Sequence, residues 1–250
     1  MTVGSLLRKI GRPVRRLLRS TGFDIVRYLP DGGVADPRAV WMRKLGIDLV
    51  LDVGANSGQF VGWIRDRDFA GRIISFEPLS RTYAEITRRW GKDPRWTGIR
   101  CALGEQEGKA TMQVAGNDMM SSSLLGMLSS HTDALPESAI VGQEEVDIRR
   151  LDKVLPEHIG RASCLYLKVD TQGYELPVIL GAGEYLKKVA LLEVELSLTP
   201  LYEGQALMPD VWNRICAMGF EPVWIDQGFT DWKEMKTLQI DALFVARSKL

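Results

Sequence analysis

The sequence lacks several features that would assign it to a class of protein at once. Lysine and arginine number 32, as do aspartate and glutamate, so the net charge is zero and no overall attraction to nucleic acid is indicated. No apolar run approaches the ~18 residues that span a bilayer. The first residues also lack the apolar core and cleavage site of a signal peptide. We therefore expect a cytoplasmic protein that binds no nucleic acid.

Cysteine is also scarce. Cys101, Cys164 and Cys216 are far apart and odd in number, so they predict neither a disulfide framework nor a zinc site. Cys164 lies in the apolar approach to a predicted strand, where we expect it to be a small core residue. This usage fits a reducing compartment.

A third absence concerns the stretch from Leu49 to Phe60, LVLDVGANSGQF, which joins an apolar strand to a glycine turn and a helix start. Such turns bind dinucleotides or S-adenosylmethionine, but the dinucleotide pattern G-x-G-x-x-G is missing because the glycines stand as G-x-x-x-G. Asn56 between them tolerates left-handed backbone geometry. S-adenosylmethionine is therefore favoured. We predict that it contacts Asp52, Gly54, Ala55, Asn56, Ser57 and Gly58.

An acidic residue follows this turn at the spacing that a ribose site requires. About 20 residues beyond such a turn, a carboxylate at the end of the next strand accepts hydrogen bonds from the ribose. Glu77 in RIISFEP ends the predicted strand Arg72 to Phe76. A connecting turn and a surface charge would explain the two pieces separately. Their spacing and strand context together favour a cofactor site.

Five blocks in order carry a family resemblance: VLDVGANSGQF, SFEP, ALGEQEG, LYLKVDTQGYE, and LLEVEL followed by PLYEG. Over roughly Leu49 to Gly204 the chain resembles the FkbM-type S-adenosylmethionine-dependent methyltransferases. The LKVDTQGYE block is the most specific, because unrelated methyltransferases share the glycine turn. The resemblance implies a Rossmann-like class I α/β fold, with a seven-stranded doubly wound sheet, an antiparallel edge hairpin and helices on both faces.

The resemblance also implies chemistry. Methyl transfer to oxygen is expected, often to a sugar or polyketide hydroxyl. Residues Ala102 to Gly104, with Leu103 between them, are expected near the adenine, although by themselves they also fit a simple glycine turn.

The chain divides into an N-terminal arm with a linker, residues 1–36, and a methyltransferase domain, residues 37–250. The first 30 residues carry seven basic side chains and one acidic one. Over residues 1–20, apolar side chains recur at helical spacing and arginines fill the other positions. This pattern suits either peripheral contact with an anionic inner membrane surface or a helical arm packed on the domain. The oligomeric state is not indicated.

A long segment from Ala115 to Gly142 interrupts the alternation of strands and helices. It lies between two short predicted strands, residues 109–114 and 144–150. Loops of this length are usually functional or disordered, and we predict a lid whose methionines and leucines cover an apolar part of the substrate or pack in the core. His131 in this segment either faces solvent or is carried to the reacting hydroxyl.

Carboxylates stand at the ends of two further predicted strands. Asp170 follows Leu165 to Val169, and Glu195 follows Val189 to Val194. Parallel strands bind ligands at their carboxyl ends, so these groups should converge with Asp52 and Glu193. Lys168 is expected to face away from Asp170 and to be structural. Tyr202, in TPLYEGQALM, is the expected substrate contact.

These residues supply two routes to an activated hydroxyl. The catalytic candidates are Asp170, Glu195 and His131, with Glu193 as a further general base. The carboxylates could instead hold Mg²⁺, or form structural pairs with arginine.

The predicted activity is O-methylation of a hydroxyl group on a sugar of a glycolipid or other glycoconjugate. The substrate is expected to be a small molecule or a glycolipid. A nucleic-acid methyltransferase and a non-catalytic glycan- or lipid-binding module are the alternatives.

Overall fold

The computed structural model describes residues 36–250, and residues 41–250 form one compact unit. The predicted basic arm, and with it the membrane contact through residues 1–20, lies outside the described residues. Among residues 36–250, no helix is both long enough and apolar enough to cross a bilayer.

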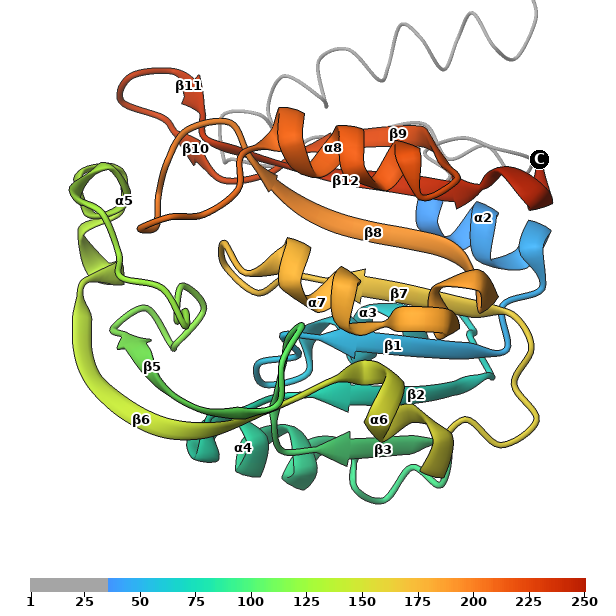
Figure 1. Ribbon diagram of the computed structural model, residues 1–250. Coiled ribbons are helices and arrows are strands. Elements are labelled where there is room, and N and C mark those ends of the chain that lie inside the picture. Colours follow the sequence, from blue (N-terminus) through green and yellow to red (C-terminus); the bar gives the residue numbers. More distant parts are fainter. Residues whose placement is uncertain (1–35) are drawn as a thin grey trace, which may run out of the picture. The chain divides into compact units, whose positions relative to one another are not determined.

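The core of this unit is a seven-stranded sheet in the order β3-β2-β1-β7-β8-β12-β9 (Figure 1). The five strands from β3 to β8 are paired in parallel, and β12 pairs antiparallel with both β8 and β9. The order reverses between β1 and β7, where open α/β sheets bind ligands. The predicted fold class is confirmed. The strands are β1 (Leu49–Val53), β2 (Arg72–Phe76), β3 (Trp96–Ile99), β7 (Leu165–Val169), β8 (Val189–Ser197), β9 (Phe220–Gln227) and β12 (Gln239–Ala246).

Helices cover both faces of the sheet. One core cluster contains side chains of α3 (Gln59–Arg65) and α4 (Ser80–Trp90), with Val61 and Ile86 among them. The opposite cluster contains side chains of α6 (Leu151–Val154), α7 (Glu175–Gly181) and α8 (Met208–Ala217) (Figure 1). Because β1 is buried over its whole length, its apolar sequence reflects cover on both sides. The other helices are α2 (Pro37–Leu45), before β1, and the short η2 (Leu155–Glu157), η3 (Gly183–Lys188) and η4 (Arg247–Lys249).

A second sheet carries the predicted lid segment. Its order is β4-β6-β5, with β4 (Ala102–Leu103) parallel to β6 (Ile140–Arg149), and β5 (Gly108–Ala115) antiparallel to it. Between β5 and β6 the chain forms α5 (Ser129–Ala134) and η1 (Pro136–Ser138). A small hairpin of β10 (Thr230–Asp231) and β11 (Lys236–Thr237) follows β9.

Candidate active site

A cavity of about 650 Å³ lies at the carboxyl ends of the central strands. Eight of the predicted site residues line it: Gly54, Ala55, Asn56, Glu77, Leu103, His131, Asp170 and Glu195. The structure therefore brings the glycine turn and the candidate acids to one place. The other four predicted cofactor residues, Asp52, Ser57, Gly58 and Gly104, do not form part of its wall.

The glycine turn after β1 touches the loop after β7. A Cβ atom added to Gly54 would lie 1.8 Å from the carbonyl oxygen of Asp170, so only glycine fits there. Gly54 also has a φ of 78°, and Asn56 has a φ of 47°, as expected for a residue that tolerates left-handed geometry. The N–H groups of Gly54 and Ala55 both donate to the carbonyl of Phe76, at 3.1 Å each. The turn is thus fixed by backbone contacts with β2 and with the chain after β7.

Glu77 is held by the same turn and by the start of α4. Its Oε1 accepts the N–H of Leu79 at 2.9 Å and the hydroxyl of Thr82 at 2.8 Å. Among residues 36–250, its Oε2 accepts only the N–H of Asn56, at 2.8 Å, and so keeps an acceptor position in a residue that lines the cavity. Burial raises the pKa of Glu77, against the effect of these hydrogen bonds.

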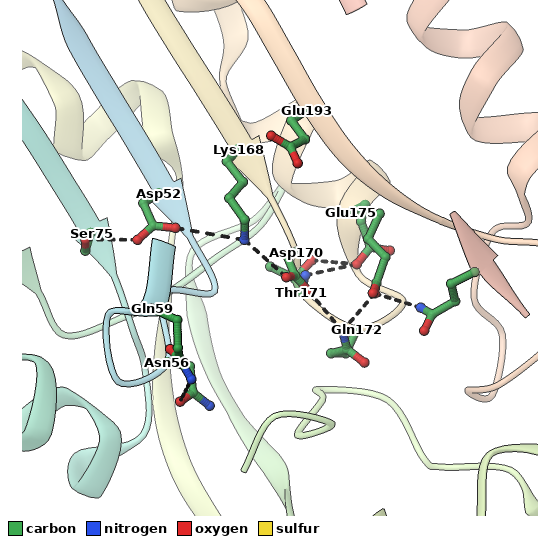
Figure 2. Close-up of polar contacts among 12 residues, drawn as sticks. Asp52, Asn56, Gln59, Ser75, Lys168, Asp170, Thr171, Gln172, Glu175 and Glu193 are labelled. Atoms are coloured by element: carbon green, nitrogen blue, oxygen red, sulfur yellow. Dashed lines mark hydrogen bonds and ion pairs between the residues drawn. The ribbon is translucent and has the colours of Figure 1, made fainter. Parts of the chain in front are cut away.

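A row of polar side chains crosses the sheet beneath the cavity. Ser75, Asp52, Lys168 and Glu193 occupy matching positions on β2, β1, β7 and β8 (Figure 2). The Ser75 hydroxyl donates to Asp52 Oδ2 at 3.1 Å, and Asp52 is completely buried. Glu193 accepts the hydroxyl of Tyr166 and does not line the cavity. Asp52 is therefore part of this buried row, below the glycine turn that is predicted to bind the cofactor (the cofactor turn), and is not on the cavity wall.

Lys168 corrects an expectation drawn from the sequence. Its Nζ lies 3.1 Å from Asp170 Oδ2 and 4.0 Å from Asp52 Oδ1, and the residue lines the cavity (Figure 2). The two residues are separated by one position, Val169, so strand alternation directs Lys168 and Asp170 to the same side. The expectation that Lys168 faces away is therefore wrong.

Burial and neighbouring charges have opposite effects on the pKa values of Asp52 and Lys168. Burial raises the pKa of Asp52 to about 6, although Lys168 and the Ser75 hydrogen bond oppose the shift. Burial would lower the pKa of Lys168, but Asp170, Asp52 and Glu193 outweigh it and raise this pKa above its usual value. Lys168 is therefore a cation at neutral pH.

An amide side chain joins the two candidate catalytic carboxylates. Gln172 Nε2 donates to Asp170 Oδ1 at 2.9 Å and to Glu195 Oε2 at 2.7 Å. Gln239 Nε2 donates to the same Glu195 oxygen at 2.7 Å. Burial raises the pKa of Glu195 well above its usual value, and the negative charge of Asp170 adds to the effect. Burial likewise raises the pKa of Glu175, which holds the turn between these groups, to about 7.

Tyr202 supports this network from behind and is not on the cavity wall. It is buried, and its hydroxyl lies 2.9 Å from Gln172 Oε1 and 3.0 Å from the carbonyl of Ser121. The predicted role as a substrate contact does not match this position. By holding Oε1, Tyr202 directs the amide nitrogen of Gln172 towards the carboxylates.

His131 is buried in the wall of the cavity, so the alternative of a solvent-facing histidine is wrong. Its Nδ1 lies 2.9 Å from the Ser138 hydroxyl, which is also 2.7 Å from the carbonyl of Leu135. The carbonyl can only accept, so the hydroxyl donates to it and we assign the ring proton to Nδ1. Burial lowers the pKa of His131. The ring is therefore neutral near pH 7.

Sequence reasoning missed three polar residues of the site: Lys168, Gln172 and Gln239. Gln172 lies inside the specific LKVDTQGYE block, which was the available signal. Gln239 gave no local signal, because it reaches Glu195 from the antiparallel strand β12. Among residues 36–250, no cluster of three or more histidine, cysteine or acidic side chains is arranged to hold a metal ion.

Comparison with known proteins identifies relatives. The model of the methyltransferase FkbM domain matches residues 52–222. The 2-O-methyltransferase NoeI of Sinorhizobium fredii is 28% identical over 63% of this chain and 66% of its own length. Methyltransferase 1 of Beauveria bassiana is 25% identical over 54% of this chain and 58% of its own. The chain thus spans less than two thirds of either relative.

Solved structures match this chain at low sequence identity and with low TM-scores. Aeropyrum pernix fibrillarin, crystallised with bound S-adenosyl-L-methionine, is 11% identical with a TM-score of 0.45, covering 83% of this chain and 74% of its own. Fibrillarin of Methanococcus jannaschii has a TM-score of 0.46 at 11% identity, covering 89% and 71%. Because the FkbM match extends over more than half of the chain, the protein belongs to the FkbM methyltransferase family.

Proposed function

We propose that the protein transfers a methyl group to a hydroxyl oxygen of a sugar, in a glycolipid or another glycoconjugate. The observation that carries this proposal is the convergence of Asp170 and Glu195, joined by Gln172, on the cavity that also contains the cofactor turn. A relative named as a 2-O-methyltransferase supports an oxygen acceptor.

The residues present fit S-adenosylmethionine. The remaining acceptor position of Glu77 Oε2 suits a ribose hydroxyl, and the bare backbone at Gly54 admits close approach. Leu79, Cys101 and Leu103 give an apolar wall for the adenine. When bound, the cofactor supplies an electrophilic methyl group on a sulfonium.

Asp170 is the group that we assign as general base. Its side chain is 36% exposed and lies in the cavity wall, with Oδ2 bound by Lys168 and Oδ1 by Gln172. These contacts fix its orientation and leave further acceptor capacity on both oxygens. A positioned base of this kind contributes ~10² to 10⁴-fold to a rate. Holding the acceptor in line with the methyl group contributes roughly 7 to 11 kcal/mol more.

Glu195 is the second proton-exchanging group. Burial and the negative charge of Asp170 raise its pKa well above its usual value, and the two glutamine amides hold it in place. His131 remains a further candidate base, since its Nδ1–H tautomer leaves Nε2 as an acceptor.

The cavity also has a large apolar wall, which supports an acceptor with an apolar part. Phe60 and Trp63 of α3 lie in it with their rings stacked 5.6 Å apart. Met119 and Met120 come from the segment between β5 and β6. That segment is joined to the cofactor turn by the hydrogen bond from Asn56 Nδ2 to the carbonyl of Asp118, at 3.2 Å. We propose that it acts as a lid over the lipid-linked end of the acceptor.

The donor set does not favour Mg²⁺ at these carboxylates. The ammonium of Lys168 already lies 3.1 Å from Asp170, and Asp170 and Glu195 both accept hydrogen bonds from glutamine N–H groups. We therefore propose base-assisted transfer. Activity that survives extensive dialysis against EDTA is the expected result, and loss of activity restored by Mg²⁺ alone would contradict it.

Radiolabelled methyl transfer tests the proposed acceptor. The protein is incubated with methyl-labelled S-adenosylmethionine and with lipid, polysaccharide and RNA fractions of a cell extract. We expect label in the glycolipid fraction, and none with Asp170→Asn. Label in RNA would instead support the nucleic-acid alternative, which a net charge of zero does not favour. Cofactor binding without transfer to any fraction would support a non-catalytic module.

The proposed membrane contact needs a separate test. Vesicles containing anionic lipid are sedimented with the full chain and with a chain lacking residues 1–20. We expect binding only by the full chain, and equal binding by both would contradict a role for these residues.

A further inference from the structure

Lys168 lies between two carboxylates that belong to different parts of the molecule. Its Nζ lies 3.1 Å from Asp170 Oδ2, at the cavity, and 4.0 Å from Asp52 Oδ1, beneath the cofactor turn (Figure 2). Its side chain is only 14% exposed, so solvent screens these charges little. The ammonium is therefore shared unequally between the two acids.

One carboxylate oxygen of Asp52 lacks a hydrogen-bond partner among residues 36–250. Asp52 Oδ2 accepts the Ser75 hydroxyl, but Oδ1 is fully buried and has no hydrogen-bond partner within residues 36–250. Buried carboxylate oxygens are usually satisfied, because an unmet acceptor costs free energy. The ammonium of Lys168 lies 4.0 Å from this oxygen, which is just beyond hydrogen-bonding distance.

Further groups surround the ammonium of Lys168. From β8, Glu193 faces it and accepts the hydroxyl of Tyr166. From α3, the ring of Phe60 lies 5.3 Å from Nζ. One lysine thus balances three carboxylates, Asp52, Asp170 and Glu193, none of which lies on the same element as another.

We propose that Lys168 is a positioning residue with two stations, Asp170 before methyl transfer and Asp52 Oδ1 after it. This rests on the proposed function, in which Asp170 is the base. In the reaction the acceptor oxygen forms its bond to the methyl carbon with its own electron pair, and its proton passes to Asp170. The carbon–sulfur pair leaves with sulfur, which becomes a neutral thioether. Asp170 is then uncharged and attracts the ammonium less, while Asp52 still offers an unmet acceptor.

Three substitutions test this proposal. Lys168→Met removes the cation at nearly constant length, Lys168→Arg keeps it, and Asp52→Asn removes the charge of the second station without changing its shape. Lys187→Met is the matched control, because the Lys187 side chain is 77% exposed. For each variant, kcat and KM are measured from pH 6 to 9 with the cell-extract fraction that the wild type labels, and the cofactor Kd is measured by calorimetry.

We expect Lys168→Met to lower kcat about 100-fold, with the cofactor Kd within threefold of the wild type. Lys168→Arg should recover at least tenfold of this loss, and Asp52→Asn should lower kcat three- to tenfold. A Lys168→Met enzyme with kcat within threefold of the wild type would overturn the proposal. So would an Asp52→Asn enzyme with the kcat of the wild type, should Lys168→Met fail to fold.

A second readout does not depend on the acceptor. The side-chain carboxyl of Asp52 is followed by NMR in protein labelled at aspartate with ¹³C. Its pKa should lie near 6 in the wild type and rise in Lys168→Met, because Lys168 lowers it. An unchanged Asp52 titration would overturn the second station. Label in an unexpected fraction would contradict the proposed acceptor and leave this result unaffected.

Discussion

Different groups determine the shape of the cavity on its cofactor side and on its acceptor side. On the cofactor side, backbone groups determine the shape: Gly54 has no room for a side chain, and the Asn56 N–H binds Glu77. On the acceptor side, side chains determine it, because Gln172 and Gln239 hold the carboxylates in place. The first arrangement tolerates almost no substitution. The second is a network in which single changes should have graded effects.

The largest effect is expected from Gly54→Ala. The new Cβ would lie 1.8 Å from the Asp170 carbonyl, and the backbone φ of 78° is itself unfavourable for alanine. We expect loss of cofactor binding and of transfer, with the free energy of unfolding reduced by more than ~4 kcal/mol. Urea unfolding and calorimetry measure both.

Gly46→Ala separates the two causes. Gly46 has a φ of 65° but nothing within 4 Å of an added Cβ, so it carries the backbone strain without the clash. We expect a loss of about 1 kcal/mol with activity retained. Equal effects at the two glycines would show that close approach to the β7 loop is unimportant.

The next largest effect is expected from Asp170→Asn, which removes the base and preserves the shape. We expect kcat to fall by ~10² to 10⁴-fold while the cofactor Kd changes little. Asp68→Asn is the control, because Asp68 is exposed and its φ of 61° suits asparagine. Turnover near that of the wild type would remove Asp170 from the reaction and leave Glu195 and His131.

Asp52 gives the cofactor side a pH dependence that Asp52→Asn should remove. Its pKa is about 6 in the folded protein against 3.8 ordinarily, so the folded state binds this proton more tightly between these values. The free energy of unfolding should therefore fall by about 2 kcal/mol from pH 4 to pH 6.5 on its account. Urea unfolding at both pH values, compared with Asp52→Asn, measures this component. If the two proteins have parallel pH dependences, the assignment to Asp52 is wrong.

Glu77→Gln should weaken cofactor binding more than it slows turnover. It removes the charge from a carboxylate that accepts three hydrogen bonds, and such charged hydrogen bonds are worth about 1.5 to 3 kcal/mol each. We expect the cofactor Kd to rise ~10- to 100-fold in calorimetry, with kcat at saturation changed much less. Glu85→Gln, at a 40% exposed side chain, should bind as the wild type does. An unchanged Kd would exclude Glu77 from the ribose site.

The smallest effect is expected from Tyr202→Phe, which releases the Gln172 amide without touching the carboxylates. A neutral hydrogen bond is worth about 1 kcal/mol, so kcat should fall three- to tenfold with the cofactor Kd unchanged. Tyr83→Phe loses a comparable bond, to the carbonyl of Gly98, away from the cavity. Equal kcat for the two variants would show that Tyr202 serves stability only.

The same contrast explains what could be predicted from the sequence. The glycine turn and Glu77 were accessible because their determinants are local: a turn, a strand end and a fixed spacing. Single strands followed from their apolar runs, and the seven-stranded sheet followed from the family resemblance. Lys168 required a correct reading of strand alternation, and Gln239 required the antiparallel pairing of β12 with β8, which no short pattern encodes. The buried position of Tyr202 depends on packing against Leu201 and Leu238, which are distant in sequence from one another.

The position of β12 has a consequence for the growing chain. This strand lies between β8 and β9 although it is formed last, and it delivers Gln239 to Glu195. During synthesis, the cofactor turn and Glu77 leave the ribosome more than 150 residues before that amide does. The half of the cavity that receives the methyl donor can therefore take shape early. The half that receives the acceptor is completed only with the final strand, and any chain ending before Gln239 lacks both the amide and the strand to which β8 and β9 pair.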